Sequence, residues 1–96
     1  KMAMSQRTRL KIGLFAKIIG SGIPIHVWDG PDFVRVYVHI KNSSVKRKVD
    51  EAFELVLANS RYYPGFEYYP ISINLLKKED IRRFSEELPA FRQRPV

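Results

Sequence analysis

Residues 23–40 read IPIHVWDGPDFVRVYVHI, and this stretch decides the fold. On either side of residues 29–32, aliphatic side chains alternate with aromatic, basic or imidazole ones. Side chains along a β-strand point alternately to opposite faces, and Gly-Pro between two aspartates is typical of a tight turn. The stretch therefore predicts a β-hairpin in which each strand has one aliphatic face.

A four-residue loop over residues 29–32 gives this hairpin a definite register. It places Trp28 opposite Phe33 and Ile25 opposite Val36, and directly opposed residues share a face of the sheet. One face is then aliphatic and belongs to the core. The other face carries ring and cationic side chains: Pro24, His26, Trp28, Phe33, Arg35, Tyr37 and His39.

A helix is predicted after the hairpin, capped by Ser43 or Ser44 and running to about residue 59. Apolar residues recur along it at helical spacing, which indicates one side packed against the core. These residues are Val45, Val49, Ala52, Phe53 and Val56.

A third strand is predicted over residues 66–75, followed by a short last helix over residues 79–88. Pro70 cannot donate to a strand ladder, so we expect this strand at an edge of the sheet. We expect Tyr68 to face away from the core. The residues expected to face the core are Tyr69, Ile71, Ile73 and Leu75.

Residues 5–19 fit either a helix or a fourth strand. As a helix they end before Gly20, a residue type favoured just past a helix C-terminus. As a strand they would place Lys17 on the core face opposite Ile25, so we favour the helix. The predicted fold is then an α+β two-layer sandwich of order α-β-β-α-β-α, with a small, mostly antiparallel three-stranded sheet and helices on one face. The alternative order is β-β-β-α-β-α.

The 96 residues are expected to form one domain, because a chain of this length does not form two cores. Lys1 precedes the first methionine. Residues 1–4 are therefore interpreted as a vector-derived remnant, or the chain as a fragment of a longer protein. Residues 89–96 are expected to be a flexible tail. The chain has no cysteine and no apolar run near the ~20 residues that span a bilayer. We therefore expect no membrane span and a cytoplasmic protein.

The net charge of +7 is concentrated near the N-terminus. Residues 1–20 hold five basic residues and no acidic one, whereas the other 76 residues hold 12 basic and 10 acidic residues. Positive charge gathered in one segment favours an anionic partner such as nucleic acid.

Aromatic side chains on an open sheet face, interleaved with cations, hold unpaired bases in several RNA-binding domains. We therefore predict a non-enzymatic domain that binds RNA or single-stranded DNA. The predicted contacts are Arg7, Arg9, Lys11, Lys17, His26, Trp28, Phe33, Arg35, Tyr37, His39 and Tyr68. The alternative is a protein-interaction or self-assembly module, a dimer or a ring, that uses the same face and the edge strand.

No pattern in the chain is typical of catalysis. There is no Gly-rich phosphate loop, paired-carboxylate motif or Ser/His/Asp spacing. His26 and His39, the two histidines, are too far apart along the hairpin to converge on one ion. We therefore predict no enzymatic activity, no metal and no cofactor.

Overall fold

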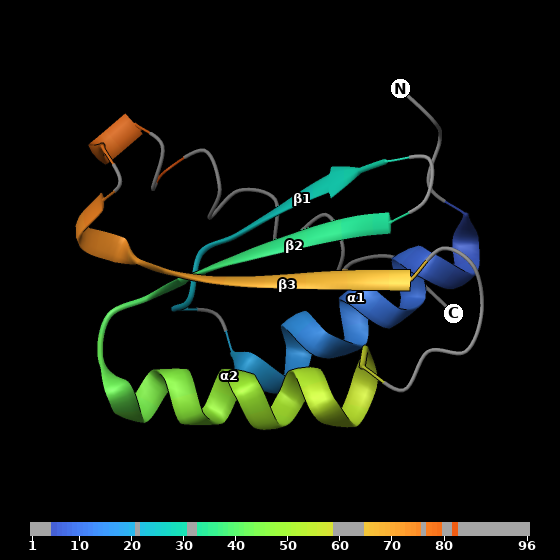
Figure 1. The fold of residues 1–96 in the computed structure, drawn as a ribbon, viewed down its shortest axis with the longest axis horizontal. Helices are drawn as coiled ribbons and strands as arrows, with labels where there is room; N and C mark the ends of the chain where they lie inside the picture. The colour runs from blue at the N-terminus through green and yellow to red at the C-terminus, as the bar shows by residue number, and fades with distance from the viewer. Residues whose placement is uncertain are drawn as a thin grey trace.

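The computed structural model describes residues 5–20, 22–30, 33–58, 65–75, 77–79 and 82. Its elements are α1 (Gln6–Ile19), β1 (Ile25–Asp29), β2 (Phe33–Ile40), α2 (Ser43–Val56), β3 (Gly65–Ser72) and a 3-10 turn, η1 (Ile73–Leu75). The strands form one sheet in the order β1-β2-β3, and Figure 1 shows α1 and α2 on the same side of it. The predicted α+β fold is confirmed, and Gln6–Ile19 is a helix rather than a fourth strand.

Three predictions fall largely or wholly outside the described residues. Of the predicted last helix, only Glu79 and Arg82 are described, and both are helical, as is the preceding Lys78. The expectations for residues 1–4 and 89–96 lie outside the described ranges altogether.

α1 begins and ends at residues whose chemistry suits helix termini. The side chain of Ser5 accepts a hydrogen bond from the Thr8 amide at 3.2 Å, which satisfies one of the donors left unpaired at a helix start. At the other end, Gly20 has a φ of 95°, a conformation that side chains disfavour, and its amide donates to the Ala16 carbonyl.

α2 is capped by Asn42, not by Ser43 or Ser44. The Asn42 side chain accepts a hydrogen bond from the Val45 amide at 2.9 Å. Asparagine and serine are about equally favoured as N-caps, so three adjacent candidates could not be separated by residue type. The predicted apolar side is confirmed: Val49 and Ala52 are buried, and the remaining members pack against the core half-buried.

The core lies between the helices and the aliphatic face of the sheet. Its fully buried sheet residues are Ile25, Val34, Val36 and Val38. Its buried helix residues are Ile12, Phe15, Ala16, Ile19, Val49 and Ala52, joined by Leu57 just after α2. Apolar surface from both helices is thus buried against one side of the sheet, which leaves the other side uncovered by them.

The predicted hairpin register is wrong by two residues. Trp28 pairs with Arg35 rather than Phe33, and Ile25 pairs with Val38. The Gly30 amide donates to the Phe33 carbonyl at 3.1 Å, so only two residues separate the ends of the hairpin. A shift of two leaves every side chain on its predicted face, because side chains alternate with a period of two.

The third strand runs parallel to β2, so the sheet is mixed rather than mostly antiparallel. The 14 residues of α2 carry the chain back to the end of the sheet where β2 began, and a helical crossover is the usual way to join parallel neighbours. β3 is an edge strand, as Pro70 predicts.

The predicted faces of β3 are reversed. Phe66 and Tyr68 lie beside Val34 and Val36 and pack against the core, whereas Tyr69 lies beside Tyr37 on the far side. The strand ends at Ser72, and the residues that follow form η1 instead of continuing it.

Candidate functional site

The face of the sheet opposite the helices, here called the open face, exposes large aromatic side chains. Phe33 is 47% exposed, Trp28 43% and Tyr69 38%. They come from all three strands, Trp28 from β1, Phe33 from β2 and Tyr69 from β3. An exposed group of large apolar side chains on one face is typical of a binding surface.

One row of stacked rings crosses the three strands on this face. Tyr37 lies between His26 and Tyr69, its register partners on the two neighbouring strands. The ring centroids of Tyr37 and Tyr69 are 5.1 Å apart at an interplanar angle of 20°. Those of His26 and Tyr37 are 5.9 Å apart at 28°. Both faces of the Tyr37 ring are therefore covered by neighbouring rings, and little of either remains for a ligand.

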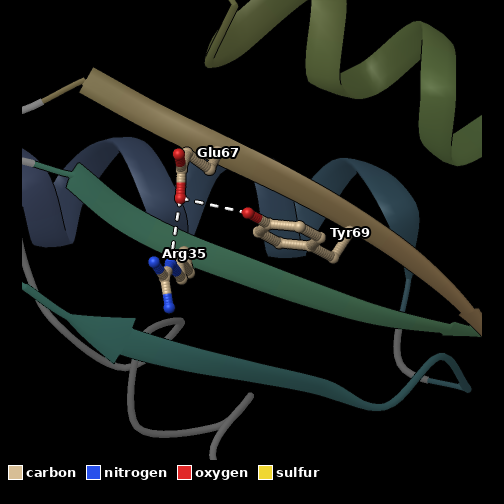
Figure 2. A network of polar contacts seen from close by, with 3 residues as sticks. All are labelled: Arg35, Glu67 and Tyr69. Atoms are coloured by element: carbon tan, nitrogen blue, oxygen red, sulfur yellow. Dashed lines mark hydrogen bonds and ion pairs between the residues drawn. The ribbon is translucent and has the colours of Figure 1, made fainter.

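A second row places a cation between an indole and a carboxylate. The Arg35 guanidinium lies 4.6 Å from the centre of the Trp28 ring. Its Nε donates to Glu67 Oε1 at 2.9 Å, and the Tyr69 hydroxyl donates to the same oxygen at 3.2 Å (Figure 2). Glu67 therefore joins the two rows and balances the charge of Arg35.

The protonation of these groups follows from the same contacts. The hydrogen bond to Glu67 raises the pKa of Arg35 above its usual value, so the guanidinium stays charged. Loss of water around Tyr69, and then the Glu67 carboxylate, raises the pKa of that phenol, so its hydroxyl remains a donor. Near neutral pH the open face therefore carries a charged Arg35 guanidinium and a protonated Tyr69 hydroxyl.

Two exposed rings lie against glycines that leave room for them. A Cβ atom at Gly30 would overlap the Trp28 ring. One at Gly65, the register partner of Phe33 on β3, would lie 3.2 Å from Phe33 Cε1. Glycine at both positions lets each ring lie against backbone, which positions Trp28 and Phe33 at the same end of the sheet.

Tyr68 is not part of the open face, contrary to the sequence prediction. Its ring stacks on Phe53 of α2 with centroids 4.7 Å apart, and its hydroxyl donates to Asp50 Oδ1 at 2.6 Å. Burial, and then the hydrogen bond to Asp50, raises the pKa of Tyr68. Tyr68 therefore joins β3 to α2.

The sequence prediction missed Tyr69 and Glu67, although one signal pointed to them. Glu67 and Tyr69 are two residues apart along the strand, so their side chains share a face. Placing Tyr69 in the core would therefore also turn the Glu67 carboxylate inward. A buried and unpaired carboxylate is costly, which argues for the opposite assignment. His39 has the predicted alternation but is buried, so it adds nothing to the exposed surface.

The cations of the N-terminal segment do not join the open face. Arg7 and Lys17 are exposed on α1, and Arg9 and Lys11 are half-buried there. α1 packs on the core side of the sheet, and Figure 2 shows Tyr69 on the opposite side from the helices. Apart from Tyr68 and His39, the predicted contacts thus form two separate surfaces rather than one.

No protein-family model, curated protein or solved structure matches this chain. None of the helices in the described ranges is long and apolar enough to cross a membrane. Nor do the described residues contain a cluster of three or more His, Asp or Glu residues placed to hold a metal ion.

Proposed function

We propose that this domain is a non-enzymatic protein-binding module and that its partner docks on the open face. The observation that carries the proposal is the exposure of Trp28, Phe33 and Tyr69 beside the Arg35–Glu67 pair. Tryptophan, tyrosine, phenylalanine and arginine are the residues enriched at the centres of protein interfaces. Rings positioned against glycine or against one another also lose little conformational entropy on binding.

The charge and ring geometry of this face favour a protein over a nucleic acid. Single-strand sites combine a positively charged groove with ring faces on which bases stack. Here the Arg35 charge is balanced by Glu67, and the ring faces of Tyr37 are covered. The outward positions of the described strands also carry no lysine.

Binding of RNA or single-stranded DNA is a second candidate function, and the cations of α1 support it. The helix carries four basic residues and no acidic one. If all four contacted phosphates, the logarithm of the affinity would fall with the logarithm of the salt concentration at a slope of about −3. A titration with mixed oligonucleotides from ~50 mM salt upwards tests this candidate, and Trp28→Ala would not change the slope.

Site-specific photo-crosslinking in cells that naturally contain the protein tests the main proposal. A benzophenone amino acid replaces Phe33 on the open face in one variant and Ser44, exposed near the start of α2, in a matched control. We expect a discrete crosslinked protein from position 33 that is absent from position 44 and lost when Trp28→Ala is added. The same products from both positions, or none from position 33, would contradict the proposal. A product from position 33 that nuclease removes would also contradict the proposal, because it would place a nucleic acid rather than a protein on the open face.

A further inference from the structure

The exposed side of α1 is basic, whereas the second half of α2 is acidic: residues 49–56 hold three carboxylates and no basic residue, after Lys46, Arg47 and Lys48 in the first half. Both charged surfaces lie beside exposed aliphatic side chains. On α1, Leu14 is 52% and Ile18 38% exposed. Lys11 lies within one turn of Leu14, and Lys17 lies within one turn of both. We call these four residues the basic helix surface. No acidic residue occurs on α1.

On α2, three carboxylates and one leucine line a shallow hollow of about 490 Å³: Asp50, Glu51, Glu54 and Leu55. We call these four residues the acidic helix surface. Leu55 is 72% exposed. Asp50 is engaged by Lys46 and Tyr68, so its charge is partly balanced within the chain.

A single exposed leucine needs no explanation in a folded protein. Here, however, the large aliphatic side chains that the two helices expose are Leu14, Ile18 and Leu55, and all three belong to these oppositely charged surfaces. A contact between the surfaces would bury aliphatic groups at its centre and place lysines beside carboxylates at its rim. Interfaces commonly combine an apolar centre with a polar rim in this way.

We propose that copies of this domain associate by packing the basic helix surface of one copy against the acidic helix surface of another. An anionic membrane or a nucleic acid would account for the basic surface alone and leave the acidic one unexplained. A second copy accounts for both, because it supplies the complement of each. The two surfaces in each contact are different, so contacts continue from copy to copy and form a ring or a filament. The exception is a closed dimer, in which the basic helix surface of each copy packs against the acidic helix surface of the other.

The proposal is independent of the protein partner assigned to the open face. Figure 1 shows both helices on one side of the sheet, and Trp28 is not part of the core between them and the sheet. Association through the helices therefore leaves the open face accessible. Trp28→Ala is accordingly a variant that should not change the association constant.

Charge reversal, followed by analytical ultracentrifugation of the full chain, tests the contact. Lys17 and Glu51 are exposed, so reversing them leaves the core intact. We expect Lys17→Glu and Glu51→Lys each to lower the association constant about tenfold or more at low salt, because each places like charges together. The chain with both substitutions should associate again, and so should an equimolar mixture of the two single variants. In the wild type, association should weaken as the salt concentration rises.

Three results would overturn the proposal. The first is a wild-type protein that stays monomeric at ~100 µM in low salt. The second is a failure of both the double variant and the mixture to associate better than the single variants, which would show that residues 17 and 51 do not face each other across a contact. The third is loss of association in Trp28→Ala with both charge reversals silent, which would assign self-association to the open face. Circular dichroism of every variant confirms that the fold is retained.

Discussion

Tyr68 and Tyr69 are neighbours in the sequence but lie on opposite sides of the sheet, so replacing each with alanine should have opposite effects. Tyr68→Ala removes a side chain that joins β3 to α2 through Phe53 and Asp50. Tyr69→Ala removes a side chain of the open face, where its contacts are with Tyr37 and Glu67. We expect the first to lower stability and the second to lower binding of the open-face partner.

The loss of unfolding free energy expected for Tyr68→Ala follows from the two contacts of this side chain. Truncating a fully buried aromatic side chain to alanine costs about 3–5 kcal/mol, and the half-buried ring of Tyr68 should lose roughly half of that. Its hydrogen bond to an ionised carboxylate adds about 1 kcal/mol after allowance for partial exposure. The expected loss is therefore about 2.5–3.5 kcal/mol of unfolding free energy. Tyr69 is exposed, so its loss should be clearly smaller.

Urea unfolding followed by far-ultraviolet circular dichroism measures both losses. Circular dichroism is preferred to tryptophan emission because substitution of Tyr69 alters the surroundings of nearby Arg35 and Trp28. Tyr68→Phe is the matched control, since it keeps the ring on Phe53 and removes only the hydroxyl. Its loss should be about 1 kcal/mol.

One pattern of results would refute the reasoning. If Tyr69→Ala destabilises the protein more than Tyr68→Ala does, the two faces of β3 are assigned the wrong way round. The exposed group on the open face would then lose Tyr69, and the proposed docking surface would lose its contribution from β3.

Three further predictions follow from single sites. Val36→Ala removes two methyl groups from a fully buried position, so thermal unfolding should show a loss of about 1.5–3 kcal/mol; a negligible loss would place Val36 outside the core. Gly30→Ala introduces a Cβ that overlaps the Trp28 ring, so the indole must move, and a red shift in Trp28 emission should report it; an unchanged spectrum would contradict the contact. Hydrogen bonds, from Lys46 first, lower the pKa of Asp50 below its ordinary 3.8, so this group stabilises the fold above that pH. The destabilisation caused by Asp50→Asn should therefore be full at neutral pH and shrink as pH falls below 3.8. A destabilisation that grew on acidification would show that folding raises the pKa of Asp50 rather than lowering it.

The hairpin shows what can be predicted from local pattern. The aliphatic residues of the two strands were assigned to the correct face, because alternation along a strand depends only on backbone geometry. The register was wrong by two residues, because it depends on how the turn closes between Gly30 and Phe33. No alternation distinguishes registers that differ by two.

The third strand shows where local pattern fails. Both of its alternating sets contain aromatic side chains, so hydrophobicity alone allowed Tyr68 or Tyr69 to face the core. The choice depends on partners from other elements. Asp50 and Phe53 of α2 contact Tyr68 on the core side. Arg35 of β2 forms an ion pair with Glu67 on the open face.

By itself the sequence determined the α+β class, the hairpin with its aliphatic and aromatic faces, the helix after it and the edge position of β3, and it favoured a helix over a strand at residues 5–19. These features depend on periodicity and on the chemistry of single residues such as Pro70 and Gly20. Only the tertiary structure decided that β3 runs parallel to β2 and which of its faces packs with the helices against the core. The side on which a helix packs depends on the apolar surfaces that it and the sheet can bury together, and that complementarity arises between elements distant in sequence.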